Sequence, residues 1–187
     1  MKKSGFTSTE LVVIIGVIGI LTLMAIPGFT TWLPNYRLKG AARDLYSNMQ
    51  LAKIGAVRAN ANWAIVFDAS VNPGRYFICS DDGPDDTWNG PPAMGYDDTV
   101  EKTVNLSKYK SGVDFGNGSA TSPLDGLPFG DGVTFDGDTV VFTSGGVVSS
   151  AGEGYVYLQN ANNDTYVLGA LGTGFILMKK WNGAAWK

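Results

Sequence analysis

The first feature of the chain is an uninterrupted apolar run near its N-terminus. Residues 11–26 read LVVIIGVIGILTLMAI, and no charged side chain occurs from Leu11 to Tyr36. At about 1.5 Å per residue, a helix over Phe6–Ile26 would span roughly 30 Å, one bilayer hydrocarbon core. The pattern predicts a membrane-spanning helix, and the short basic segment 1–5 (MKKSG) would stay on the cytoplasmic side.

A second apolar pattern follows at helical spacing. Apolar side chains recur at alternating intervals of four and three residues, which places them on one helix face: Leu38, Ala42, Leu45, Met49, Ala52, Ala56 and Ala59. We expect this stripe to lie on a sheet of its own domain. The basic residues between these positions, such as Arg43 and Arg58, are interpreted as a solvated face. Pro34 is expected to disturb the helix.

From residue 63 the pattern changes to short β-rich runs that are separated by turn residues. Trp63–Phe67 and Arg75–Cys79 form a predicted hairpin across Asn72-Pro73-Gly74. Later runs add further predicted strands: Thr99–Leu106, Val133–Phe135, Thr139–Phe142, Gly154–Leu158, Tyr166–Leu171, and Gly174–Trp181 paired with Ala184–Trp186 across Asn182-Gly183. Residues 80–98 and 116–132 read as loops.

This order of elements predicts the α+β class, with a long N-terminal hydrophobic helix packed on a C-terminal antiparallel β-sheet domain. We divide the chain into a leader over residues 1–5 and a hydrophobic transmembrane helix over 6–36. An amphipathic half of the helix follows over 37–62, and a globular antiparallel β domain over 63–187.

The composition excludes several classes of function. Charged residues make up 17% of the 187 residues, the net charge is −3, and there is no histidine. The acidic balance argues against a nucleic-acid partner, because phosphate contacts need a basic face. Zinc sites and Ser-His or Cys-His nucleophiles lack their usual ligand or base, so we predict no catalytic residues. The single cysteine, Cys79, is interpreted as a small buried apolar residue, with a reactive thiol as the alternative.

One carboxylate interrupts the first apolar segment. Glu10 stands just inside it, and an ionisable group in a membrane segment costs free energy and usually has a partner. A secretory signal peptide needs small residues at a cleavage site after the apolar run, and residues 24–29 (MAIPGF) fit that pattern poorly. An uncleaved signal anchor is the plain alternative, but it leaves Glu10 unexplained.

Residues 5–21 (GFTSTELVVIIGVIGIL) resemble the N-terminal signature of type IV prepilins. The resemblance implies that a prepilin peptidase cuts between Gly5 and Phe6 and methylates the new amine of Phe6. It also implies that Glu10 meets the N-terminal amine of a neighbouring subunit during assembly, because a carboxylate neutralises that cation in a dry layer. Pro27 falls where members of this family carry a helix-kinking proline.

Two further stretches resemble the GspH/FimT-like minor pseudopilin family. They are residues 41–68, at the passage from helix to first strand, and most of residues 140–186. The resemblance implies a subunit of a type II secretion pseudopilus or a type IV pilus. Such a subunit starts as a single-pass protein of the bacterial inner membrane, with its globular domain in the periplasm. Residues 80–130 resemble nothing that we can name.

The acidic loop offers the one candidate metal site. Asp81, Asp82, Asp85 and Asp86, with Asp97 and Asp98 at the end of the loop, are candidate calcium ligands, because calcium takes carboxylate and carbonyl oxygens. Their spacing is not that of an EF-hand, and we favour a solvated loop with no cofactor.

Other surface chemistry concerns DNA and aromatic residues. Some FimT-like pilins bind DNA through a Gly-Arg-x-Arg strand, and the corresponding Gly174–Leu177 has no arginine, which argues against that activity. Trp88 in the acidic loop is expected to be exposed and is a candidate contact for a sugar or partner. Trp63, Trp181 and Trp186 are attributed to core and hairpin packing.

We therefore expect a structural subunit and no enzyme. The expected partners are other pilin or pseudopilin subunits, the prepilin peptidase, the inner membrane and its assembly platform. Two alternatives stay open. The chain is a major pilin that builds the whole filament, or it is a DNA-uptake or adhesive binding pilin.

Overall fold

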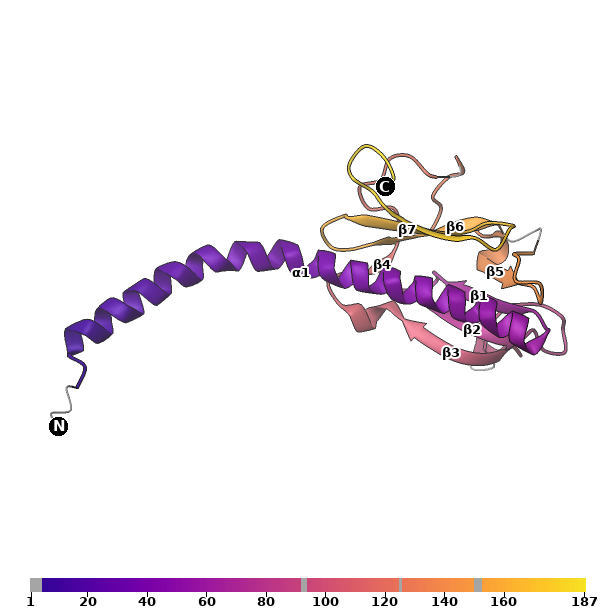
Figure 1. The fold of residues 1–187 in the computed structure, drawn as a ribbon, viewed down its shortest axis with the longest axis horizontal. Coiled ribbons are helices and arrows are strands. Elements are labelled where there is room, and N and C mark those ends of the chain that lie inside the picture. The colour runs from indigo at the N-terminus through magenta and orange to yellow at the C-terminus, as the bar shows by residue number, and fades with distance from the viewer. Residues whose placement is uncertain (1–4, 92–93, 125, 150–152) are drawn as a thin grey trace. The chain divides into compact units, whose positions relative to one another are not determined.

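Helix α1 runs from Ser8 to Ala59 in the computed structural model (Figure 1). The structure describes residues 5–91, 94–124, 126–149 and 153–187, without the side chains of residues 23–31. The chain divides into two compact units, and the division falls between Leu33 and Pro34. Pro34 lies inside α1 and does not end it.

The C-terminus of α1 is closed by backbone hydrogen bonds. Asn60 takes a left-handed conformation with φ 52°, and the Ala61 N–H donates to the Ala56 carbonyl over 3.2 Å. This pattern satisfies carbonyls that the end of a helix otherwise leaves unpaired. The helix therefore stops at Ala59, slightly before the predicted end of the amphipathic segment at residue 62.

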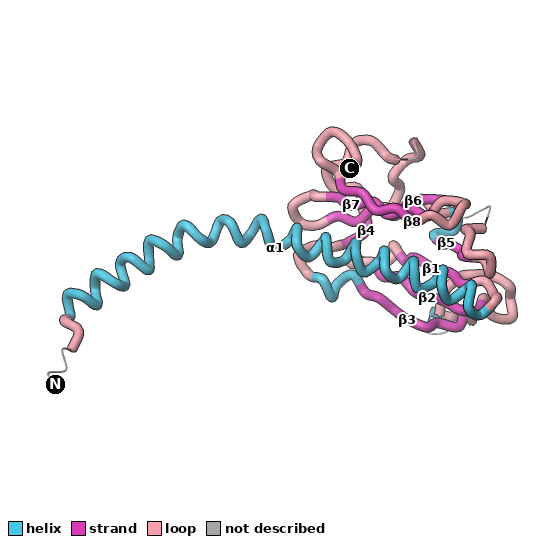
Figure 2. Tube along the Cα trace, viewed as in Figure 1, coloured by secondary structure: helices cyan, strands magenta, loops and turns pink. Residues whose placement is uncertain are grey.

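In the described residues, eight strands follow α1 and form two antiparallel four-stranded sheets (Figure 2). The first sheet has the order β3-β2-β1-β5 and consists of β1 (Trp63–Asp68), β2 (Arg75–Asp81), β3 (Thr99–Asn105) and β5 (Thr139–Phe142). The second sheet has the order β4-β6-β7-β8 and consists of β4 (Asp114–Phe115), β6 (Gly154–Gln159), β7 (Thr165–Ala170) and β8 (Ile176–Lys180). Two short 3-10 helices, η2 (Leu106–Tyr109) and η3 (Asp136–Asp138), precede β4 and β5.

The register of the first hairpin follows from its turn and from one ion pair. Strands β1 and β2 pair antiparallel from Ala64↔Cys79 to Asp68↔Arg75. At the turn, the Arg75 Nε donates to Asp68 Oδ2 over 2.8 Å, and Asp68 is 7% exposed. Burial raises the pKa of the Asp68 carboxyl, but hydrogen bonds from Ser70 and Arg75 outweigh burial and lower it. The ionised Asp68 carboxylate is therefore the form that stabilises the turn of this hairpin.

The main core joins α1 to both sheets. The buried face of α1 comprises Leu38, Ala41, Ala42, Leu45, Met49, Ala52 and Ala56. This face packs in one cluster with Ile65 and Tyr76 of the first sheet and Leu158 and Leu168 of the second. The alanines let the sheets approach the helix closely, because a methyl group takes little space. The predicted stripe is confirmed except at Ala59, which is exposed.

A buried polar link ties α1 to the first sheet within this core. Asn48 is 4% exposed, and its Nδ2 donates to the Tyr76 hydroxyl over 2.7 Å. The Lys102 ammonium donates to Asn48 Oδ1 over 2.9 Å. The two strands that carry these partners, β2 and β3, are thus fixed to one position along the helix.

The structure differs from the predicted strands in four places. Ala184–Trp186 forms only the isolated bridge between Trp181 and Trp186, and is not a strand. Val133–Phe135 forms only an isolated bridge between Val133 and Val156, and is not a strand. Strand β4 was not predicted, because two residues carry no periodicity. The β domain contains two sheets, which local patterns do not separate because each sheet repeats the same alternation.

We expect that Tyr76→Phe destabilises the protein by about 1–2 kcal/mol, because it leaves the buried amide of Asn48 without its acceptor. The matched control is Tyr96→Phe, since Tyr96 is 44% exposed and should change stability by less than about 0.5 kcal/mol. Urea unfolding followed by circular dichroism measures both. Equal effects of the two substitutions would show that the Asn48–Tyr76 link contributes nothing.

Candidate functional site

The start of α1 is a capping box built from Thr7 and Glu10. The Thr7 hydroxyl accepts from the Glu10 N–H over 3.2 Å. In return, the Thr7 N–H donates to Glu10 Oε2 over 3.0 Å, and the Thr7 hydroxyl lies 3.1 Å from the same oxygen. These bonds satisfy backbone donors that the first turn leaves free. Glu10 therefore has a structural role inside its own chain.

Sequence reasoning missed Thr7, although the signal was present. Thr7 and Glu10 stand in the S/T-x-x-E spacing directly before an apolar run, which is the pattern of a capping box. Glu10 was interpreted only as a charge inside an apolar run, and not also as part of a helix cap. Glu10 Oε2 accepts both bonds from Thr7, whereas Oε1 accepts none among the described residues. One carboxylate oxygen is thus left for another donor.

The predicted cleavage residues lie just outside the helix. Gly5 and Phe6 precede Ser8, the first residue of α1, and have no regular secondary structure. The Phe6 side chain is 77% exposed. An extended and accessible segment is what a protease needs in order to bind a peptide bond. Pro27, the predicted kink, lies in the stretch whose side chains are not described, so its role stays a prediction.

The first turns of α1 expose apolar side chains on every face. Exposed residues between positions 11 and 21 are Leu11, Val12, Val13, Ile14, Ile15, Val17, Ile18, Ile20 and Leu21. A Cβ added at Gly16 or Gly19 would meet nothing within 4 Å. Within the described part of the chain, no helix combines the length and the apolarity needed to cross a bilayer.

Two carboxylates of the acidic loop accept hydrogen bonds from the loop's own residues. Asp81 accepts from the Gly83 N–H over 2.9 Å. Asp85 accepts from the Thr87 N–H over 2.9 Å and from Asn89 Nδ2 over 2.8 Å. No bond to the carboxylates of Asp82 or Asp86 occurs in the described residues. Among these residues, no three histidine, cysteine, aspartate or glutamate side chains gather to hold a metal ion.

A buried carboxylate at the end of the acidic loop anchors it. Asp98 is 1% exposed and accepts from the Gly90 N–H over 2.8 Å and the Asn89 N–H over 3.2 Å. Burial raises the pKa of the Asp98 carboxyl, and these two N–H groups oppose that rise. The sequence placed Asp98 in the acidic loop, but nothing local distinguished it from its exposed neighbours.

Cys79 is a free and fully buried cysteine in β2, as the sequence predicted. Burial raises the pKa of the Cys79 thiol, and the nearby Asp98 carboxylate raises it further. The thiolate is the reactive form of cysteine, so this environment suppresses its chemistry.

The C-terminal residues are engaged in packing. Lys180 forms an ion pair with Asp164 over 3.0 Å. Trp181 is 5% exposed and its ring lies 5.1 Å from that of Trp186, whose Nε1 donates to the Ser122 carbonyl over 2.8 Å. These contacts confirm the hairpin-packing interpretation of both tryptophans. Trp88, which we expected to be exposed, is half-buried, and that prediction was wrong.

Comparison with known proteins finds one similarity of fold. No protein-family model and no curated protein matches the chain. Among solved structures, the chain is similar to the minor pseudopilin EpsH from the Type 2 Secretion System of Vibrio cholerae. The two share 14% identity and a TM-score of 0.44, over 76% of this chain and 95% of that one. The predicted α+β class, a long N-terminal helix packed on antiparallel β-sheets, is confirmed by the order of the elements and by the shared core.

We expect the melting temperature to be the same in calcium and in a chelator, because the loop carboxylates already accept hydrogen bonds from their own loop. Differential scanning calorimetry with CaCl₂ and with EGTA measures this. A rise in Tm that grows with calcium concentration, and that Asp85→Asn abolishes, would contradict the expectation and establish a calcium site.

We expect Cys79 in the folded protein to react with a thiol reagent at least roughly a hundredfold more slowly than in guanidinium chloride. The reason is that the thiol is fully buried and held protonated. Because the chain has one cysteine, the absorbance of the released thiol of Ellman's reagent reports on this position alone. Equal rates with and without denaturant would contradict a buried thiol.

Proposed function

We propose that the chain is a minor pilin or pseudopilin, a structural subunit of a type IV pilus or of a type II secretion pseudopilus. It carries out no chemistry of its own and assembles through the N-terminal half of α1. The observation that carries the proposal is a helix with exposed apolar side chains on every face, headed by one carboxylate, Glu10. A major pilin would use the same segment in the same way.

The exposed apolar helix supports assembly because it has nothing of its own to pack against. A helix that is apolar all round is normally buried, in a large core or in lipid. The open space at Gly16 and Gly19 fits this, since small residues let a neighbouring helix approach closely. This segment would therefore lie first among lipids and later among equivalent helices of other subunits.

The second element of the proposal is processing and location. Residues 1–5 form the leader, and the prepilin peptidase cleaves between Gly5 and Phe6 and methylates the Phe6 amine. Before cleavage the protein crosses the bacterial inner membrane once, by the run Leu11–Ile26, with Pro34–Lys187 in the periplasm. The basic leader on the cytoplasmic side supports this orientation. The assembly platform then moves the processed subunit into the filament.

The third element is charge neutralisation at Glu10. Cleavage creates an ammonium group at Phe6 in an apolar layer, where an isolated charge is costly. Glu10 Oε2 is held by Thr7, which keeps the carboxylate at the start of the helix. Its other oxygen would accept from the Phe6 ammonium of a neighbouring subunit, and this pairing would set the register between subunits.

The test separates the charge of Glu10 from its role as a cap. Glu10→Gln keeps the capping-box geometry, because glutamine also fits that position, but removes the charge. Glu10→Ala removes both, and Thr7→Ala removes the cap while keeping the charge. We expect all three proteins to be processed at Gly5–Phe6, with both Glu10 variants at least about tenfold depleted from filaments, a loss of about 1.4 kcal/mol or more.

Thr7→Ala should assemble better than either Glu10 variant. Mass spectrometry of the membrane fraction measures cleavage and methylation, and quantitative immunoblotting of sheared filaments measures incorporation. Normal incorporation of Glu10→Gln would overturn the charge-neutralisation step. An uncleaved protein that never leaves the membrane would overturn the proposed function as a whole.

A further inference from the structure

The acidic loop packs a tryptophan on the face of the first sheet opposite α1. On β1 and β2, Ile65 and Tyr76 belong to the main core, whereas the alternate residues Val66, Phe77 and Cys79 form a second cluster. Trp88, Met94 and Val100 pack against this second cluster. Both faces of the first sheet are therefore covered, and the Asp98 anchor holds the loop that covers the outer one.

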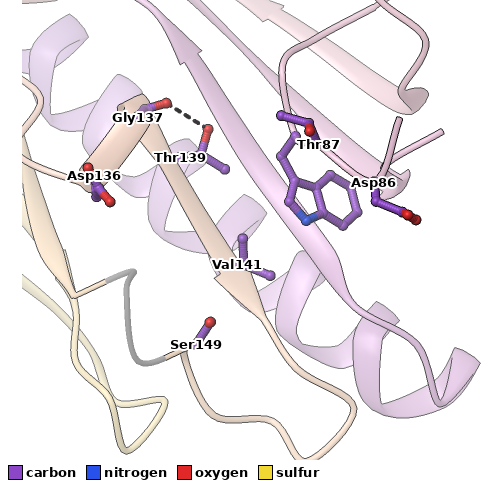
Figure 3. Close-up of a pocket in the computed structure, with 8 residues that line it drawn as sticks. Asp86, Thr87, Asp136, Gly137, Thr139, Val141 and Ser149 are labelled. Carbon is purple, nitrogen blue, oxygen red and sulfur yellow. Dashed lines mark hydrogen bonds between the residues drawn. The ribbon is translucent and has the colours of Figure 1, made fainter. Parts of the chain in front are cut away.

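Two cavities open beside Trp88. The first has a volume of about 280 Å³, and its lining includes Asp86, Thr87, Asp136 and Ser149 (Figure 3). In Figure 3, Asp86 and Thr87 come from the acidic loop, and Asp136 and Gly137 from η3 on the opposite side.

The second cavity has a volume of about 310 Å³, and its lining includes Asp68, Phe77, Tyr96 and Asp138. Trp88 and Gly137 line both cavities. The loop and η3 thus form two neighbouring hollows that share an aromatic wall.

The backbone of η3 fixes the side of this site opposite the loop. Gly137 takes a left-handed conformation with φ 59°, and its carbonyl accepts from the Thr139 hydroxyl over 3.0 Å (Figure 3). This arrangement places Asp136 in the lining of one cavity and Asp138 in that of the other.

The charged side chains that line the two cavities are all acidic. Asp86, Asp136, Asp68 and Asp138 contribute carboxylates, and no lysine or arginine belongs to the described lining of either cavity. Among these four, only Asp68 forms an ion pair with a described residue, Arg75. The pKa of Asp138 is raised by burial and then by the neighbouring carboxylates of Asp131 and Asp68. The negative charge of Asp86, Asp136 and Asp138 is therefore not compensated by a basic residue in the described part of the chain.

We infer that the cavities beside Trp88 bind an arginine or lysine side chain of a partner protein. A guanidinium or ammonium group is attracted to the face of an indole ring and donates to carboxylates at the same time. A neutral sugar would also stack on Trp88 but would leave the carboxylates unneutralised. The lining therefore favours a cation over a carbohydrate.

The partner is a protein that presents a basic side chain to the outer face of the first sheet. This contact involves Pro34–Lys187 alone and does not depend on the N-terminal segment of α1. It would give the globular domain a specific contact in addition to any packing of α1 helices. Because the contact is ionic and partly solvated, salt should weaken it.

The test titrates the full chain, in detergent micelles, with Nα-acetyl-arginine amide. The chain contains five tryptophans, and NMR of ¹⁵N-tryptophan-labelled protein resolves each indole N–H signal, with Trp88→Phe assigning that of Trp88. We expect the Trp88 signal to shift progressively while that of Trp186 stays in place. The neutral citrulline amide, which has nearly the same shape, should produce no shift.

Carboxylate variants test the charge directly. The double variant Asp136→Asn with Asp138→Asn should bind the arginine amide about fivefold or more weakly, as expected for lost charge-assisted bonds. Asp82→Asn is the matched control, because it removes a carboxylate of the same loop that lines neither cavity.

Equal shifts with arginine and citrulline amides, or equal weakening by Asp82→Asn, would overturn the inference. A Trp88 shift with chitotriose but not with the arginine amide would overturn it in favour of a carbohydrate. No shift with either probe would also overturn it. The proposed role in a filament would survive all three results, because it concerns the other unit of the chain.

Discussion

Burial of one face of α1 is the interaction on which the globular unit depends. Both sheets pack on the same run of small and apolar side chains from Leu38 to Ala56, and they also meet directly where Phe67 of β1 contacts Phe115 of β4. The alanines in this run bring the sheets close, and the link between Asn48 and Tyr76 fixes the first sheet along the helix axis. Since no strand of one sheet pairs with a strand of the other in the described residues, loss of this face would leave each sheet without a large part of its apolar partner.

The same helix carries both parts of the proposed function. Its later turns bury one face within the chain, whereas its first turns expose apolar residues on all faces. Apolar surface of that extent is unfavourable in water, which is why the proposed function places this segment among lipids or other subunits. The hydrogen bonds of the capping box hold the Glu10 carboxylate against Thr7, at the first turn of the helix. A residue that resembled a solitary charge in an apolar run is held in position by its own first turn.

Much of the fold was predictable because its signals are local. The helical stripe, the hairpin from Trp63 to Asp81 and the later strands Thr139–Phe142 and Gly154–Gln159 each follow from side-chain period and turn residues. For the candidate calcium site, two of the four aspartates, Asp81 and Asp85, serve instead as hydrogen-bond acceptors in turns of their own loop, and the described residues gather no three metal-ligating side chains. Val133–Phe135 looked like a strand because its pattern is apolar, but it has only one bridged partner.

The sequence by itself determined the class of the fold, because side-chain period and turn residues act over a few neighbouring positions, and its N-terminal signature predicts the roles of Gly5, Phe6 and Glu10. Only the tertiary structure decided that Asp98 is the buried anchor of the acidic loop, and that Trp88 lies on the sheet beside Gly137. Aspartates in such a loop are chemically alike, and their roles differ only through burial and partners from distant strands. Such contacts join residues that are far apart in the sequence, so the period of apolar side chains does not predict them.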